Sequence, residues 1–289
     1  MKSYWLVAGA AMLGMACVVT ARPAGAVACG DVLTGPGAFR LDQDLVCSTT
    51  TALVVRDGAT LDLGGHTVTC ADLDNGIAVT GSRARLMNGT VTGCNDGVSL
   101  SGERHVVKGV HAKFNVRGFL AEDGLDDSRV SDSSAEFNGA GGFIVFGNGN
   151  LLRRNEAFGN ADVAIFVVGN DNTLTRNATN GNCIVGGCAA AYEIGGNDNT
   201  LTRNTATGEA TGFLITSGFG ETSANTLTRN KALFSFLAGI VVQDGATGNT
   251  LVRNTASGAG THLVDFNEDC DANQWHRNTF DTANQSCIE

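Results

Sequence analysis

Short stretches of alternating apolar and polar residues recur along most of the chain, without the 3.6-residue period of a helix. The most regular unit, Asn-Thr-Leu-Thr-Arg-Asn, occurs unaltered at 172–177, 199–204 and 225–230, with variants at 150–155, 249–254 and 273–278. Its central apolar position can be followed from Leu63 to Trp275 in ten copies, 21 to 27 residues apart. Repeats of this length are typical of solenoids and propellers.

A second apolar strand follows the central position of most repeats and is preceded by glycine, as in 76–79, 142–146 and 239–242. Between the strands lie turns rich in Gly, Asn and Asp, which tolerate a positive φ. A leucine-rich repeat has a similar length, but no half of the unit is helical. The pattern therefore predicts an all-β protein, a parallel β-helix of about ten coils.

The closing asparagine of the unit predicts a buried column of stacked amides. Neighbouring coils lie ~4.8 Å apart, so equivalent side chains stack and can bond to one another and to the turns. A surface turn preference is the alternative. The residues of the predicted ladder are Asn155, Asn177, Asn204, Asn230, Asn254 and Asn278. Earlier coils have His66, Gly89, Val110 and Ser133 there, which limits the ladder to the C-terminal coils.

The N-terminal segment is typical of a secretory signal peptide: Lys2, an apolar run over 5–19 and small residues up to Ala28. The run is too short to span a membrane, and Gly14 and Ala26 stand where a lipidation signal would have leucine before Cys17 and Cys29. We therefore expect a secreted or periplasmic protein with a signal peptide at 1–28, an N-terminal cap at 29–58, a β-helix at 59–264 and a C-terminal cap at 265–289.

Removal of the leader leaves eight of the nine cysteines, an even number that favours disulfides in an oxidising compartment. Proximity in the sequence favours the pairs Cys29–Cys47, Cys70–Cys94, Cys183–Cys188 and Cys270–Cys287, although eight cysteines allow many pairings. The formal net charge of −10 argues against nonspecific nucleic-acid binding.

The Asn-x-Leu-x-x-Asn units, the glycine-led strands and the segment 61–68 (LDLGGHTV) resemble the right-handed parallel β-helix proteins of the pectin-lyase-like superfamily. Within it, the repeats are similar to those of the periplasmic copper-site maturation proteins. The resemblance covers about residues 29–289 and is specific for the fold, because such coils carry lyases, hydrolases, epimerases and proteins without known activity. It raises the question of copper, but Met87 and five scattered histidines form no evident copper site.

Carbohydrate-active members of the superfamily generally use acidic and basic residues on the outer face of the long strand. Alternation places Ala78, Ser99, Leu120, Ile144, Phe166, Glu193, Leu214, Val241 and Val264 on that face. Most are apolar, which predicts cover by loops, by a second copy of the chain or by another partner. Glu193 is the one charge in this column, and Asp126 and Asp127 resemble the paired aspartates of polygalacturonases. Glu193, Asp126 and Asp127 are the weak catalytic candidates. For the two aspartates, a solvated turn is the alternative interpretation.

Two further patterns concern ligands. Asp265, Asn267, Asp269 and Asp271 have the alternate spacing that begins a calcium loop, but Cys270 and His276 stand where such a loop needs Gly and Glu. We therefore expect no cofactor and keep calcium as a weak candidate. The arginines of the units form a predicted exposed stripe, a candidate surface for an anionic glycan or envelope component. The alternative is that these arginines only keep the turns of the coils soluble. The stripe comprises Arg154, Arg176, Arg203, Arg229, Arg253 and Arg277.

The absence of an assembled set of acids and bases favours a binding or structural module at the cell envelope or outside the cell, with glycan binding as one form of it. A polysaccharide lyase or glycoside hydrolase is the alternative. We expect no membrane span and no nucleic-acid partner.

Overall fold

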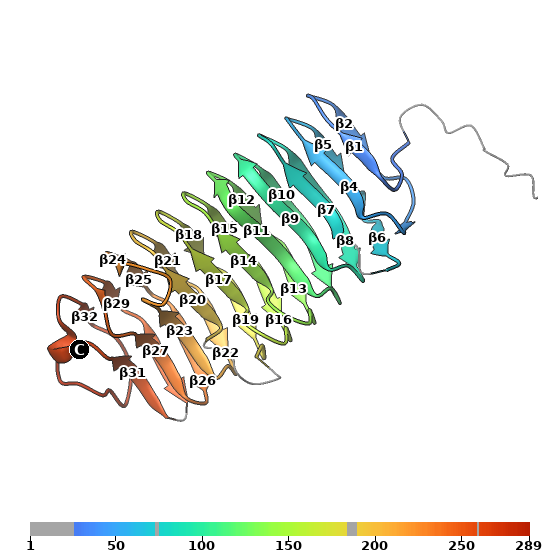
Figure 1. The fold of residues 1–289 in the computed structure, drawn as a ribbon. Helices are drawn as coiled ribbons and strands as arrows, with labels where there is room; N and C mark the ends of the chain where they lie inside the picture. The colour runs from blue at the N-terminus through green and yellow to red at the C-terminus, as the bar shows by residue number, and fades with distance from the viewer. Residues whose placement is uncertain (1–25, 73–74, 184–189, 259) are drawn as a thin grey trace, which may run out of the picture.

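The structure, a computed structural model, describes residues 26–72, 75–183, 190–258 and 260–289. The chain winds into an elongated all-β parallel solenoid of about ten turns, with the N-terminal coils at one end and the C-terminal coils at the other (Figure 1). No helix in this part of the chain is long and apolar enough to cross a membrane.

One long parallel sheet runs along the solenoid and joins one strand from each coil. Within the described residues it consists of β1 (Asp31–Leu33), β4 (Thr51–Arg56), β7 (Asn75–Thr80), β9 (Asp96–Glu103), β11 (Arg117–Asp126), β14 (Phe143–Phe146), β17 (Ile165–Val168), β20 (Tyr192–Gly195), β23 (Thr211–Ile215), β27 (Ala238–Val242) and β31 (Thr261–Asp265).

The other two sides of the coils are built from shorter strands. The repeated unit supplies β2 (Ala38–Arg40), β5 (Thr60–Asp62), β12 (Arg129–Ser131), β15 (Leu151–Arg153), β18 (Thr173–Thr175), β21 (Thr200–Thr202), β25 (Thr226–Thr228), β29 (Thr250–Val252) and β32 (Gln274–His276). The third side has β3 (Leu45–Cys47), β6 (Thr67–Cys70), β13 (Ser134–Glu136), β16 (Glu156–Phe158), β19 (Ala178–Asn180), β22 (Thr205–Thr207), β26 (Lys231–Ser235) and β30 (Thr255–Gly258). The strands β8 (Arg85–Thr92) and β10 (Val106–Lys113) run through both sides; β24 (Thr222–Ser223), β28 (Ala246–Thr247) and the short 3₁₀ turn η1 (Glu268–Cys270) complete the chain.

From Leu86 onward the register between coils is the one that the repeats predict, whereas in the coil before it Leu61, and not Leu63, pairs with Leu86. Leu174, Leu201 and Leu227 stand directly above one another in adjacent strands, and all three are fully buried. The predicted N-terminal cap also contributes strands to all three sides, because β1, β2 and β3 pair in register with β4, β5 and β6. The core is thus a stack of apolar layers enclosed by three sheets.

The predicted asparagine ladder is present, and Asn204 shows its geometry. Its Oδ1 accepts from the backbone N–H of Asn177 at 2.9 Å, and its Nδ2 donates to the carbonyl of Leu174 at 2.9 Å. The backbone N–H of Asn204 donates in turn to Oδ1 of Asn230 at 2.9 Å. Each side chain therefore closes the corner of the coil before it, and its own corner is closed by the next coil.

Two further columns occupy the other corners, and neither was predicted from the sequence. The opening asparagines of the units form one: Asn150, Asn172, Asn199, Asn225, Asn249 and Asn273. The third corner has Asn115, Asn138, Asn160 and Asn182, and ends in Glu209. The carboxylate of Glu209 is 1% exposed and accepts from both the backbone and the side chain of Asn182 at 3.0 and 2.9 Å.

The arginine before each closing asparagine has a left-handed backbone, with φ between 53° and 58°. Gly109 and Asp132 have the same conformation at this corner in earlier coils. We had expected Gly, Asn and Asp to make the corners. Here arginine takes the position because the bend directs its side chain outward while the following asparagine turns inward.

Three of the four predicted disulfides lie within the described residues: Cys29–Cys47, Cys70–Cys94 and Cys270–Cys287. The fourth predicted pair involves Cys188, which lies outside them, as does the predicted signal peptide up to residue 25. The first bridge joins the start of the chain to β3, and the third ties η1 to the C-terminal tail. Both ends of the solenoid are thus cross-linked.

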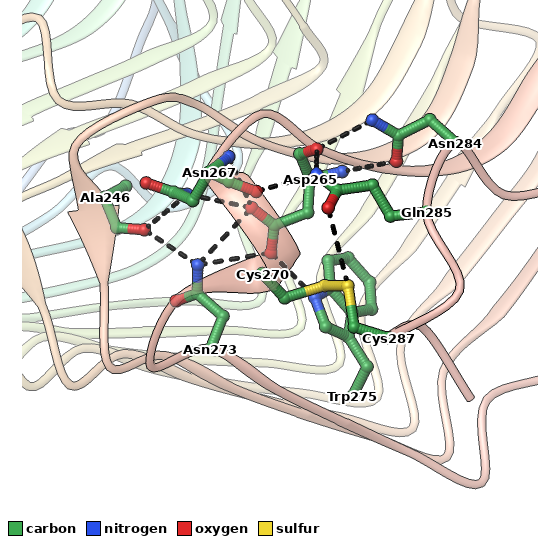
Figure 2. Close-up of a disulfide and its surroundings, with 9 residues drawn as sticks. All are labelled: Ala246, Asp265, Asn267, Cys270, Asn273, Trp275, Asn284, Gln285 and Cys287. Carbon is green, nitrogen blue, oxygen red and sulfur yellow. Dashed lines mark hydrogen bonds between the residues drawn. A yellow bond between two sulfur atoms is a disulfide. The ribbon is translucent and has the colours of Figure 1, made fainter.

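The C-terminal end is closed around a buried carboxylate, that of Asp265 (Figure 2). Asp265 is fully buried at the end of β31 and accepts from the indole Nε1 of Trp275 at 2.9 Å and from Nδ2 of Asn267 at 2.8 Å. Asn273 donates to its second oxygen at 3.2 Å. The disulfide Cys270–Cys287 lies beside this network. Asp265 therefore joins three segments of the cap.

We predict that Asn204→Ala lowers the free energy of unfolding by about 1–3 kcal/mol, because it leaves the N–H of Asn177 and the carbonyl of Leu174 without partners. Urea denaturation measures this loss. Asn180→Ala is the matched control, since Asn180 is exposed on β19, and it should change the free energy of unfolding by less than about 0.5 kcal/mol. Equal effects of the two substitutions would contradict the role of the ladder.

We predict that Asp265→Ala lowers the free energy of unfolding by about 3 kcal/mol, because it leaves the indole N–H of Trp275 and the backbone N–H of Asn267 buried without acceptors. Asp269→Ala removes an exposed carboxylate of the same cap and serves as control in the same denaturation experiment. A similar small loss for both variants would show that the network around Asp265 contributes nothing specific.

Candidate functional site

The outer face of the long sheet carries a hollow of about 360 Å³ in the middle of the solenoid. It lies across β11, β14, β17 and β20, the green to yellow strands of Figure 1. Its lining consists of Arg117, Leu120, Ile144, Phe146, Asp162, Val163, Phe166 and Glu193. The hollow therefore combines three ionisable side chains with an apolar floor.

The floor follows from the alternation of the strands. Leu120, Ile144, Phe166 and Glu193 face one another across adjacent strands in a single register column. Their neighbours on either side along each strand point into the core and are buried. The outward column is thus the one predicted from the sequence, and Glu193 is a charged residue placed at the end of an apolar row.

Aromatic side chains border this row. The ring of Phe166 makes edge contacts with Phe146 at 5.5 Å and with Phe219 at 5.1 Å between centroids. Phe219 comes from the turn that follows β23 and is 53% exposed. It lies over Gly195, two residues after Glu193. The turn therefore adds an exposed ring beside the carboxylate.

The charges of the hollow are unequally neutralised. Arg117 donates to Asp96 through both Nε and Nη2, the latter at 3.0 Å, and the carboxylate of Asp96 is nearly buried. Glu193 has no hydrogen-bond partner among the described residues. Burial raises the pKa of Glu193, and the charge of Asp162 raises it further. The hollow thus holds two carboxylates, whereas its guanidinium is already paired.

We predict that Glu193→Gln makes the protein more stable than the wild type at pH 8 and has no such effect at pH 4. A carboxyl group whose pKa is raised in the folded state destabilises the folded protein as the pH rises above the pKa that the group has in the unfolded state. The benefit of the neutral amide therefore appears only at the higher pH. Thermal unfolding at the two pH values measures the difference. The exposed Asp198→Asn is the control, and a benefit of Glu193→Gln at pH 4 equal to that at pH 8 would contradict this linkage.

The other two catalytic candidates do not lie in the hollow. Asp126 ends β11, where its carboxylate accepts from the backbone N–H of Asn148 at 3.0 Å. Asp127 follows in a left-handed turn, φ 51°, with its carboxylate exposed and 4.0 Å from Arg104. Both therefore belong to a turn at the opposite end of the strand from Arg117.

Arg117 and Asp162 were missed in the sequence. Arg117 stands at the start of β11 and Asp162 stands before β17, so each lies at a corner that leads into a strand of the long sheet. Neither lies in a recognisable motif, and they approach Glu193 only because the coils stack. The available signal was a charged residue directly before a glycine, as at Arg117, or two positions before an alanine, as at Asp162, where the chain leads into a long strand.

Three of the four calcium candidates, Asn267, Asp269 and Asp271, line a shallow hollow of about 390 Å³ together with Asp244 and Glu268. Asp265 is buried and bonded to Asn267, whereas Asp269 and Asp271 are exposed. The described residues contain no group of three or more His, Cys, Asp or Glu side chains that could hold a metal ion. The buried histidines are engaged as well: Nδ1 of His105 accepts from the N–H of Ala84, and burial lowers the pKa of His105.

The arginine stripe is exposed along one corner of the solenoid. Arg154 is paired with Asp132, and this pairing lowers the pKa of Asp132 and raises that of Arg154. Arg253 and Arg277 line a shallow hollow of about 400 Å³ together with His276 and the C-terminal Glu289. Binding of an anionic polymer to the stripe stays a prediction.

The C-terminal part of the outer face is already covered within one chain. Leu214, Val241 and Val264 are 5%, 8% and 8% exposed and form a second apolar cluster with Ala190 and Ala238. This cluster is separate from the core inside the coils. Association of two copies through the apolar face stays a prediction, and the part of the face that remains open is the hollow.

A family model described as a right-handed beta helix region matches residues 75–231, more than half of the chain, and the protein therefore belongs to the right-handed β-helix family. No curated protein sequence matches the chain. The relationship is thus established at the level of the family.

Solved structures share the fold at low sequence identity. The catalytic unit of a thermostable GH87 α-1,3-glucanase from Streptomyces thermodiastaticus strain HF3-3 is 13% identical, with a TM-score of 0.56 over 89% of this chain and 64% of its own. The A-module of the mannuronan C-5 epimerase AlgE6 from Azotobacter vinelandii is 15% identical, with a TM-score of 0.56 over 88% and 86%. Pectate lyase Pel9A is 18% identical, with a TM-score of 0.52 over 87% and 72%. The chain spans less than two thirds of the glucanase unit, and these likenesses concern the fold.

Proposed function

We propose that the protein is an exported β-helix protein that binds a carbohydrate chain in the hollow on the outer face of the long sheet. The observation that carries this proposal is the position of Glu193 and Asp162 beside the row Leu120, Ile144 and Phe166. A sugar ring has apolar faces and a rim of hydroxyl groups. An apolar floor with a few polar groups at its edge suits both.

The polar edge is available for a ligand. The carboxylate of Glu193 has no partner among the described residues, so it can accept hydrogen bonds from hydroxyl groups. Phe146 and Phe219 provide aromatic edges on either side of Phe166. The three solved structures with this fold are a glucanase, a mannuronan epimerase and a pectate lyase by name, which supports a polysaccharide ligand by analogy of fold.

Export is supported by the pattern of the first 28 residues and by the disulfides at both ends of the solenoid. A glycan-binding module of this kind would act in the periplasm, at the cell envelope or outside the cell. The proposal includes no copper site, because the described residues contain no group of three or more His, Cys, Asp or Glu side chains that could hold a metal ion.

Glycoside hydrolysis is the second candidate function, and the pKa of Glu193 favours it. A carboxyl group whose pKa is raised by burial and by a neighbouring charge is better suited to protonate a leaving oxygen, while a second carboxylate assists as base or nucleophile. Glu193 would be the acid and Asp162 its partner. Arg117 would act on the substrate only indirectly, since it is paired with Asp96.

We predict that a glycan screen identifies at least one oligosaccharide whose affinity falls tenfold or more in Phe146→Ala, because this ring borders the hollow. Tenfold corresponds to about 1.4 kcal/mol of binding free energy. Calorimetry or NMR titration measures the affinity. Phe114→Ala is the matched control, since Phe114 is 59% exposed and does not line the hollow.

Binding of no glycan, or equal loss in the two phenylalanine variants, would overturn the proposed site. Release of products from a polysaccharide by the wild type, with no release by Glu193→Gln, would establish the hydrolase. Binding without product release leaves the binding function alone.

A further inference from the structure

The charge of the hollow carries an inference about the kind of sugar that it accepts. Two carboxylates, Asp162 and Glu193, face the hollow, and a single cation, Arg117, lines it. Arg117 is engaged by Asp96 in a two-point ion pair, so its charge is already balanced by a carboxylate that the ligand does not reach. The surface offered to a ligand is therefore acidic over an apolar floor.

We propose that the hollow binds a sugar unit with a free amino group, a hexosamine, whose ammonium lies between Glu193 and Asp162. This inference rests on the proposed carbohydrate function and specifies the ligand class. An ammonium group has three N–H donors and no acceptor, and two carboxylates without a hydrogen-bond partner among the described residues provide the matching acceptors.

A positive ligand also removes the main electrostatic cost of the site. Glu193 is partly buried and stands close enough to Asp162 to be affected by its charge. A cation between them replaces the repulsion of two like charges by two attractions. The apolar face of the sugar ring would lie on Ile144 and Phe166, which pair in register on the adjacent strands β14 and β17.

An acidic sugar has the opposite fit. The carboxylate of a uronic acid would approach Asp162 and Glu193, and the guanidinium of Arg117 could serve it only by giving up its bonds to Asp96. Breaking that pair would leave the nearly buried carboxylate of Asp96 without its cation. The hollow is thus expected to bind oligogalacturonate poorly, although a pectate lyase shares the fold.

The test compares three tetrasaccharides by calorimetry at a pH at which the amine is protonated: β-1,4-linked glucosamine, its N-acetylated form and oligogalacturonate. We expect the glucosamine tetramer to bind at least tenfold more tightly than the N-acetylated tetramer, and oligogalacturonate to bind least. Raising the salt concentration should weaken the first interaction most, because it depends on charge.

Variants separate this site from general attraction to an acidic protein. Glu193→Gln and Asp162→Asn should each abolish most of the preference for the free amine, while binding of the N-acetylated tetramer persists. Asp198→Asn removes one exposed carboxylate outside the hollow and should retain the preference. Circular dichroism checks that each variant is folded.

The outcomes distinguish the inference from the function on which it rests. Equal affinity for the free and N-acetylated tetramers, tighter binding of oligogalacturonate, or a preference that survives both substitutions in the hollow would overturn the hexosamine inference and leave carbohydrate binding in place. Absence of binding by all three, together with a negative glycan screen, would overturn both.

Discussion

The stacking of buried amides at the corners is the interaction on which the rest of the fold depends. A coil turns three times, and at each turn backbone N–H and carbonyl groups leave the strands and face the interior without water. Asn177, Asn204 and their equivalents satisfy these groups from the neighbouring coil. Because the side chain must reach one strand spacing and no further, the amides also fix the register of the strands between them.

This register places the functional surface. Once the corners are fixed, alternation decides which side chains face outward on the long sheet, and the outward column becomes a row across coils. Most of the row is aliphatic and is covered by its own neighbours near the C-terminus, as at Val241 and Val264. The hollow lies where the row contains Glu193 and where Asp162 and Arg117 enter from the corners. Its chemistry therefore comes from residues that depart from the repeat.

The sequence was sufficient for the repetitive part of the structure. The period, the inward Leu and Asn, the parity of the long strands and the terminal disulfides could be predicted because each depends on local spacing. Asp162 and Arg117 could not be linked to Glu193, since their proximity depends on how four coils stack and on the ion pair that orients Arg117. The four calcium candidates are divided for the same reason: alternate spacing on β31 directs Asp265 into the core, whereas Asp269 and Asp271 follow after the strand has ended. Calcium binding stays a prediction.

The direction of the ladder makes the two ends of the solenoid chemically different. Every asparagine side chain in the three buried corner columns serves the coil before it, so the corners of the last described coil depend on other groups. At this end the carbonyl of Glu289 accepts from the backbone and the side chain of Asn278, both at 3.1 Å, and Oδ1 of Asn284 accepts from the N–H of Asp265. The buried ladder therefore has a direction along the solenoid, and its two ends require different partners.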